Sequence, residues 1–161
     1  VTLVNVAVAN APAVLAFNNA KGLFVDENLR QAVSYALDYD AFKTYFGSAY
    51  AQIPNRGFVP ETTVGYKQTE KLTTDQAKAA EYMAAAGYSE KNANGFYVNG
   101  DGQIASFTLT VNAAKEAHVG YAEMIKNQLE QFGIQVNLYS SAEVMRSRRH
   151  RNIFFCDVDS Q

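Results

Sequence analysis

The feature that most constrains the fold is the segment of residues 104–140, which reads as a strand, a helix and a second strand. Apolar and polar residues alternate over residues 105–111 and again over 134–139, the period of two that separates the faces of a strand. The helix between them carries an apolar stripe at spacings of three and four, formed by Ala122, Ile125, Leu129 and Phe132. Two strands joined by such a helix favour a parallel, right-handed βαβ crossover.

The alternation in these two strands leaves two interpretations open. Parallel strands are usually buried on both faces and then read as continuous apolar runs. Either the polar face looks into a cleft, where Thr and Asn would suit a polar ligand, or the strands lie at an edge with one solvated face. We take the cleft as the working expectation.

Three more helices are predicted before this segment. Asp26 is a plausible N-cap for a helix that runs to about Leu37, and Asp40 is expected to cap a short helix that ends before Gly47. The spacing Thr73-x-x-Gln76 is that of a capping box and predicts a helix over residues 75–86. The long stretch 49–65 holds two prolines and two glycines without periodicity, which is typical of a loop that is either functional or unusually well packed.

The remaining elements are predicted from turn signals and short apolar runs. Asn94-Gly95 and Asn99-Gly100-Asp101-Gly102 flank residues 96–98 and favour a small hairpin. Strand candidates lie at residues 1–10, 13–17 and 153–158, and a short helix is expected over 142–149. Together these elements predict the α/β class, with helices packed on a mixed sheet.

Composition excludes several classes of protein. The chain has 161 residues, 48% of them hydrophobic, which suffices for one ordinary domain with a core. A net charge of −2 gives no general attraction to nucleic acid or anionic membranes. The single Cys156 excludes an internal disulfide. Because the chain opens with Val1 inside an apparent strand, without a signal peptide, we expect a fragment of a longer protein.

The usual signatures of catalysis and metal binding are missing from the sequence. It contains no phosphate-binding or dinucleotide-binding glycine motif, no His-Glu-x-x-His and no Gly-x-Ser-x-Gly. His118 and His150 have no second His or Cys at the spacing of metal ligands. We therefore expect no catalytic residues, no metal site and no cofactor.

Two groups of residues could serve binding instead. As a nucleic-acid contact, the basic cluster of residues 146–151 would be short and would lack interleaved aromatic residues, which favours other roles. It is either a solvated face or a source of one Arg that pairs with a ligand carboxylate. Among ten Tyr and ten Phe, Phe58 and Tyr66 lie in the long loop, where aromatic side chains often contact ligands.

Several segments, in this order and spacing, are similar to one family. They are Phe17-Asn18 with residues 26–38 (DENLRQAVSYALD), residues 57–60 (GFVP) with Gly65-Tyr66, residues 77–88 (AKAAEYMAAAGY), and residues 122–136. The chain resembles the extracytoplasmic solute-binding proteins, family 5, of ABC importers for oligopeptides, dipeptides and nickel. Residues 155–158 resemble the strand that precedes the family's Trp- and Asp-containing ligand anchor, and the chain ends before that anchor.

The resemblance implies one lobe of a type II periplasmic-binding-protein-like fold, here residues 1–161 as much of the second lobe. It implies a protein that captures peptides outside the cytoplasmic membrane, closes around them at a hinge and delivers them to the ABC permease subunits. Its membrane attachment would be a lipid anchor outside this fragment. The resemblance does not determine the length of the peptide. A nickel chelate or a sugar remains an alternative ligand.

The expected ligand-binding residues come partly from position and partly from the resemblance. Asn112 follows the first central strand, at the carboxyl end where open α/β sheets tend to bind ligands, although it could equally cap the next helix. Asn18 ends an earlier strand and Phe58 lies in the long loop. The family often places a basic residue before its last strand here, which suggests Arg148 or Arg149.

Two other classes of function remain as alternatives. This type of lobe also occurs as the sensory domain of transcriptional regulators, which a helix-turn-helix upstream of Val1 would reveal. An enzyme domain would show turnover that depends on His118 or His150.

Overall fold

The strand–helix–strand segment forms a parallel βαβ unit, as predicted. In the computed structural model, β4 (Ser106–Val111) and β5 (Gln135–Ser140) are parallel neighbours, and α4 (Glu116–Phe132) crosses between them. The register pairs Phe107 with Val136 and Leu109 with Leu138. The structure describes residues 13–47, 51–56, 59, 61, 63–140 and 153–156.

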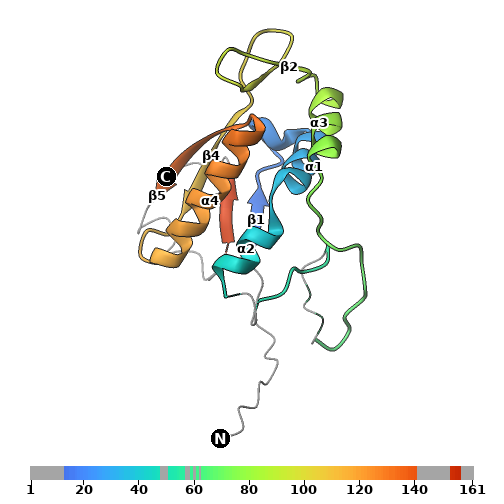
Figure 1. Ribbon diagram of the computed structural model, residues 1–161, viewed down its shortest axis with the longest axis vertical. Helices are drawn as coiled ribbons and strands as arrows, with labels where there is room; N and C mark the ends of the chain where they lie inside the picture. Colours follow the sequence, from blue (N-terminus) through green and yellow to red (C-terminus); the bar gives the residue numbers. More distant parts are fainter. Residues whose placement is uncertain are drawn as a thin grey trace, which may run out of the picture.

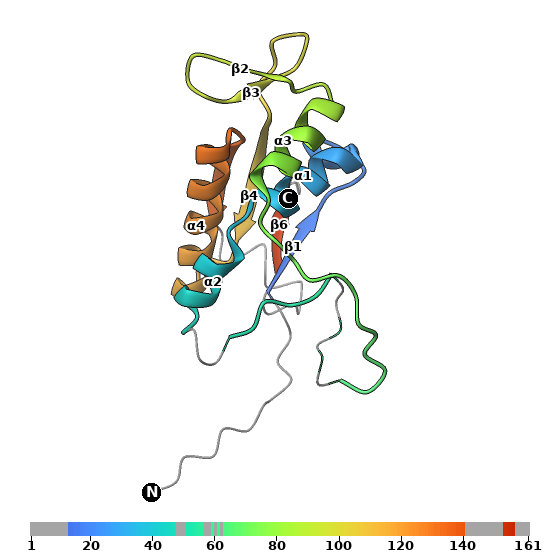
Figure 2. The ribbon, with the colours of Figure 1, turned by 45° about the vertical axis from the view of Figure 1, so that its right-hand side comes forward.

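Two more strands complete a mixed sheet in the order β1-β6-β4-β5 (Figure 1). The strand β1 (Val14–Phe17) runs parallel to β6 (Ile153–Cys156), whereas β6 runs antiparallel to β4. It follows that β1 and β4 point in opposite directions. Their carboxyl ends therefore lie at opposite ends of the sheet, and Figure 2 shows the arrowheads of β1 and β4 pointing in opposite senses.

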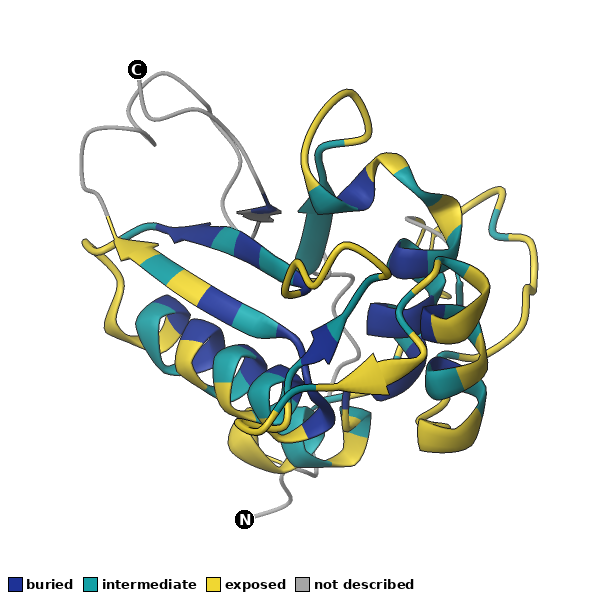
Figure 3. Ribbon diagram, turned by 90° about the horizontal axis from the view of Figure 1, so that it is seen from above, coloured by how far each residue is buried: buried dark blue, intermediate teal, exposed yellow. Residues whose placement is uncertain are grey.

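The helix α4 covers one face of β4 and β5 and buries it (Figure 3). The side chains of β4 that face this helix are almost fully buried, as are Leu129 and Phe132 of α4. On the other face Asn137 and Tyr139 of the edge strand β5 are exposed. The edge strand β5 thus fits the solvated-edge interpretation of the alternating pattern. The strand β4 does not, because it lies between β6 and β5 and its Thr110, on the same face as Tyr139, is only 3% exposed.

A pair of helices packs beside α4. The helix α1 (Glu27–Ala36) follows the short 3₁₀ turn η1 (Leu23–Val25) and contacts α3 (Gln76–Ala85) along its length. Asp26 caps α1, as predicted, by accepting a hydrogen bond from the Asn28 amide at 2.8 Å. Leu29 and Val33 form the buried face of α1, also as predicted.

The start of α3 satisfies the carbonyl groups that the end of α1 leaves without a helical partner. The Asp75 amide donates to the Tyr35 carbonyl at 2.8 Å, and the Gln76 side chain donates to the Ala36 carbonyl at 2.8 Å. The Thr74 hydroxyl donates to the Leu37 carbonyl at 2.7 Å. Carbonyl groups at a helix end need such partners when they are buried. These bonds therefore hold the end of α1 against the start of α3.

Two predicted helix caps are wrong by a few residues. The short helix α2 (Tyr39–Tyr45) is capped by Asp38, which accepts from the Ala41 amide, and Asp40 lies in its first turn. The helix α3 is capped by Asp75, which accepts from the Lys78 amide, and not by Thr73. In both cases a nearby Asp has the extended backbone that a cap requires, and Gln76 is engaged with α1.

The predicted hairpin consists of β2 (Glu90–Lys91) and β3 (Tyr97–Val98), which are antiparallel. It packs on the corner between α4 and β5, where the Tyr97 amide donates to the Gly133 carbonyl at 2.8 Å. Gly133 has a φ of 129°, and a Cβ there would lie 2.8 Å from the Tyr97 ring. A residue without a side chain is therefore needed at this corner.

The strand predicted at residues 1–10 and the helix predicted at 142–149 lie outside the described residues. Within the part that the structure describes, no helix has the length and apolar character needed to cross a membrane.

Candidate functional site

The carboxyl ends of the parallel strands β4 and β5 are the place where an open α/β sheet tends to bind ligands. Asn112 follows β4 directly and is partly exposed. Its side-chain oxygen accepts a hydrogen bond from the Ala114 amide at 2.9 Å, which closes the turn before α4. The N-cap of α4 is Lys115, without a side-chain cap bond. Asn112 therefore shapes the turn rather than capping the helix, and its amide nitrogen remains a possible donor to a ligand.

The structure does not bring Asn18 to this end of the sheet. Asn18 follows β1, where its amide donates to the Cys156 carbonyl at 3.2 Å and its side chain accepts from the Ala20 amide at 3.0 Å. Because β1 and β4 run in opposite directions, Asn18 and Asn112 lie at opposite ends of the sheet. Phe58, Arg148 and Arg149 lie outside the described residues.

An aromatic cluster lies where α2 meets the first turns of α4. It consists of Phe42, Tyr45, Phe46 and Tyr121. The ring of Tyr121 lies 4.2 Å from that of Phe46 and 5.0 Å from that of Tyr45, between centroids. Tyr45 and Phe46 are 49% and 54% exposed, although Tyr121 is buried. Two half-exposed aromatic rings thus flank the end of the molecule that also carries Asn112.

This cluster depends on a glycine inside α4. A Cβ built on Gly120 would lie 2.1 Å from the hydroxyl oxygen of Tyr45. The close approach explains why a residue that disfavours helices stands in the second turn of α4. The sequence pattern did not reveal the cluster, because Tyr45 and Tyr121 belong to helices that are far apart in the chain.

The buried hydroxyl of Tyr121 makes stability depend on pH. Burial raises the pKa of Tyr121, and the nearby Tyr45 adds to this effect. The fold therefore favours the neutral phenol, and this contribution is complete below about pH 10, where an unfolded Tyr begins to ionise. We expect the free energy of unfolding to fall as the pH rises above about 10, and to fall less steeply in Tyr121→Phe.

The measurement is urea unfolding at a series of alkaline pH values. Tyr39, Tyr88 and Tyr97 also have raised pKa values through burial, so the comparison is between the slopes of the two proteins. Identical slopes for the original chain and Tyr121→Phe would show that Tyr121 ionises as freely in the folded state as in the unfolded one.

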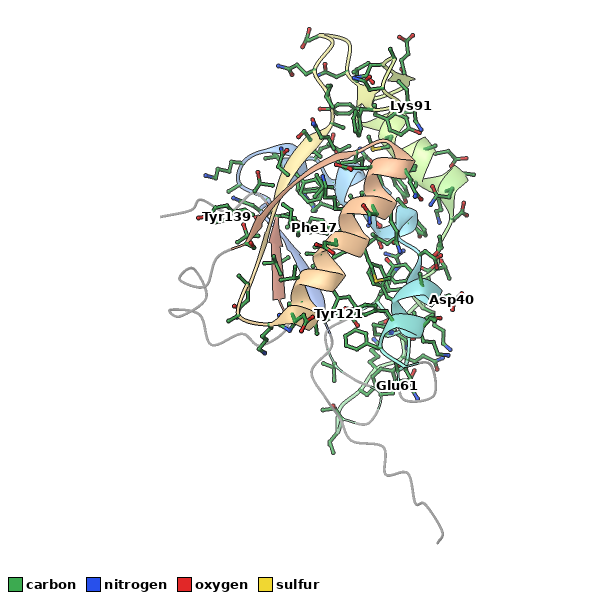
Figure 4. The ribbon with its side chains drawn as sticks, turned by 60° about the vertical axis from the view of Figure 1, so that its left-hand side comes forward. Phe17, Asp40, Glu61, Lys91, Tyr121 and Tyr139 are labelled. Carbon is green, nitrogen blue, oxygen red and sulfur yellow. The ribbon has the colours of Figure 1, made fainter. Side chains whose placement is uncertain are left out.

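In the structure the long loop predicted at 49–65 is closed between Arg56 and Glu70, and from here on the long loop means residues 56–70. It reaches the same end of the molecule (Figures 1 and 2). Its base is closed by an antiparallel bridge between Asn55 and Lys71. Tyr66, one of the two predicted loop aromatics, accepts a hydrogen bond from the Asn55 side chain. In Figure 4 the labelled Glu61 of this loop and Tyr121 both lie toward the lower end, away from Lys91 of the hairpin.

The described residues were also compared with two other kinds of site, a metal centre and a surface groove. They contain no group of three or more His, Cys, Asp or Glu side chains that could hold a metal ion. An open groove is lined by η1, the start of α1 and the end of α3, with Asp26 and Tyr88 among its residues. It does not include Asn112 or the aromatic cluster.

Comparison with known proteins places this arrangement in a family. The family model for bacterial extracellular solute-binding proteins, family 5, matches residues 3–154. The oligopeptide-binding protein AppA of Bacillus subtilis is 26% identical over 127 residues, which are 76% of this chain and 23% of AppA.

Solved structures show the same fold. NikZ from Campylobacter jejuni, in complex with Ni(L-His), superposes with a TM-score of 0.73 at 20% identity over 88% of this chain and 28% of NikZ. AppA in complex with a nonapeptide gives 0.71 at 22% identity, covering 88% of this chain and 29% of AppA. NikA from Brucella suis, in complex with Fe(III)-EDTA, gives 0.72 at 23% identity over 88% of this chain.

The chain spans about a quarter of the length of these relatives. The segments singled out by resemblance, the mixed α/β sheet and the match of residues 3–154 agree with one another. The chain belongs to the family 5 bacterial extracellular solute-binding proteins.

Proposed function

We propose that this chain is one ligand-binding lobe of the substrate-binding protein of an ABC importer, and that its ligand is a peptide. The observation that carries the proposal is the family match over residues 3–154, together with the relationship to an oligopeptide-binding protein. A second lobe, joined by a hinge, would close over the ligand and present the complex to the permease. The protein would act outside the cytoplasmic membrane, held there by a lipid anchor, as a binding protein rather than an enzyme.

The proposed contact surface is the end of the lobe that carries Asn112, together with Phe58 and with Arg148 or Arg149. An Asn amide can both donate to and accept from a peptide backbone, and an Arg guanidinium can pair with a carboxylate. The exposed rings of Tyr45 and Phe46 add apolar surface at this end. Asn18 lies at the other end of the sheet and is left out of the surface.

A peptide and a metal chelate are competing candidates for the ligand. The neighbouring structures hold Ni(L-His), Fe(III)-EDTA and a nonapeptide. We expect calorimetry of the complete two-lobed protein to give submicromolar binding of oligopeptides and at least about a hundredfold weaker binding of either chelate, a difference of about 2.8 kcal/mol. Tighter binding of a chelate than of every peptide would overturn the peptide assignment.

Asn112 offers a matched pair of variants for the same titration. Asn112→Asp keeps a side-chain oxygen for the Ala114 amide but replaces the donor by a charged carboxylate oxygen, whereas Asn112→Ala loses both the acceptor and the donor without adding a charge. If the amide nitrogen donates to the ligand, both variants bind at least about fivefold more weakly, in line with the loss of one hydrogen bond. If only Asn112→Ala is weakened, Asn112 merely holds the turn and does not contact the ligand.

A sensory domain of a transcriptional regulator is the second candidate function. The same lobe would then bind the same class of ligand but report to a DNA-binding module. The gene region upstream of Val1 separates the two: a secretion signal with a lipid-attachment site supports import, and a helix-turn-helix supports regulation.

A further inference from the structure

Arg56 lies at the base of the long loop, where the chain enters and leaves it. The Arg56 amide donates to the Glu70 carbonyl at 2.7 Å, and the Leu72 amide donates to the Pro54 carbonyl at 3.3 Å. The Thr69 hydroxyl donates to the Arg56 carbonyl. These bonds join the two arms of the loop to each other. They do not by themselves attach the loop to the rest of the lobe.

The Arg56 side chain makes that attachment. Its guanidinium carbon lies 4.7 Å from the centre of the Tyr35 ring of α1, and its Nη1 donates to the Ser34 hydroxyl at 3.3 Å. Its Nε lies 3.6 Å from a carboxylate oxygen of Glu70 on the returning arm. This one side chain of the entering arm therefore contacts both α1 and the returning arm, and it is 24% exposed.

The surface that receives Arg56 is held by contacts between α1 and α3. Tyr35 is buried and stacks on Tyr82 of α3, with the two rings 5.8 Å apart and inclined by 7°. The carbonyl of Tyr35 is bound by the Asp75 amide at the start of α3. A planar guanidinium can stack on such a ring and donate sideways at the same time, which an ammonium group does less well.

The contacts continue from the base into the loop. Asn55, next to Arg56, is buried and donates from its side chain to the Tyr66 hydroxyl. The Tyr66 amide donates to the Thr63 carbonyl at 3.0 Å. The position of Tyr66 relative to α1 is thus set through Asn55 and Arg56.

We propose that Arg56 is a positioning residue for ligand capture: it fixes the loop that carries Tyr66 against α1, so that the loop meets the ligand in one conformation. This proposal rests on the proposed binding function. A loop that is held in its bound conformation before the ligand arrives loses less conformational entropy on binding. Arg56 itself need not touch the ligand.

Lys78 provides a matched control. Its ammonium nitrogen lies 4.5 Å from the centre of the same Tyr35 ring, but it belongs to α3 and not to the loop. Removing either cation deprives Tyr35 of one cation–π contact. Only the removal of Arg56 should release the loop.

The test measures hydrogen exchange of single amides by NMR in the complete protein and in Arg56→Gln, Arg56→Lys and Lys78→Gln. We expect the Tyr66 and Leu72 amides to exchange about tenfold faster in Arg56→Gln, the size that loss of one cation–π contact with its hydrogen bond implies. Arg56→Lys should restore protection only in part. Lys78→Gln should leave both amides unchanged, and the Ala79 amide of α3 should stay protected in all variants.

Peptide titration of the same variants completes the test. We expect Arg56→Gln to bind peptide at least about fivefold more weakly, mainly through faster dissociation, and Lys78→Gln to bind as the original protein does. Unchanged loop exchange in Arg56→Gln, or an equal increase in Lys78→Gln, would overturn the positioning role. So would faster loop exchange in Arg56→Gln with unaltered peptide affinity.

These results separate the inference from the proposed function. If the original protein binds neither peptides nor chelates, the proposed function fails, and with it the role in ligand capture. The exchange data would still show whether Arg56 holds the loop, because that measurement needs no ligand.

Discussion

Replacing Val33 by Asp should leave the chain largely unfolded at room temperature. Val33 is 0% exposed, in the middle of α1 on the side that faces the core. A carboxylate there would be buried without a charged or hydrogen-bonding partner, which costs several kcal/mol. The total stability of a domain is only about 5–15 kcal/mol, and a loss of this size exceeds the stability of a domain at the low end of that range, which we expect for this chain when it is separated from the rest of the protein. Circular dichroism during thermal unfolding measures the effect directly.

Gln31→Asp is the control for this prediction. Gln31 lies in the same helix and is partly exposed, so an Asp there stays hydrated while changing the charge by the same amount. We expect its melting temperature to fall by no more than a few degrees, the cost of a weaker helix former. Equal melting temperatures for Val33→Asp and the original chain would mean that Val33 does not face the core.

The repeating patterns of the sequence predict most of the elements, because each reports on burial along a single segment. The stripe in α4 and the alternation in β4 and β5 correspond to buried faces in the structure. Helix caps were less predictable. Asp38 and Asp40 both offer a carboxylate at the start of α2, and the choice between them depends on the backbone around residue 38. Gln76 could not act in a capping box once its side chain was bound to the end of α1.

The candidate site was harder to predict, because it depends on how segments meet. Asn18 and Asn112 each follow a strand, and the sequence does not show that β1 and β4 point in opposite directions. Arg56 and Tyr35 are separated by a helix and part of a loop, and nothing in either segment indicates their contact. The aromatic cluster could not be predicted from the sequence for the same reason, because Tyr45 and Tyr121 come together only when α2 packs on α4. Loop composition did single out Tyr66, whose ligand contact stays a prediction.

The largest effect on binding should come from separating this lobe from the rest of the protein. A small-molecule site usually buries 70–90% or more of its ligand, roughly, and a cleft between two lobes divides that contact between them. If the proposed two-lobed arrangement holds, the 161-residue chain alone would offer one of the two surfaces and would still bear the cost of immobilising the peptide. We expect it to bind peptides at least about a hundredfold more weakly than the complete protein, a loss of about 2.8 kcal/mol or more.

Calorimetry with one peptide, on the complete protein and on the 161-residue chain, measures this loss. The chain must first be shown to be folded. The criterion is cooperative thermal unfolding, which we expect the Val33→Asp substitution to abolish. If the folded chain binds the peptide within about threefold of the complete protein, less than half of a tenfold step in free energy, then one lobe makes all the contacts that matter. Closure of two lobes would then contribute nothing to affinity, and the hinge mechanism would serve only delivery to the permease.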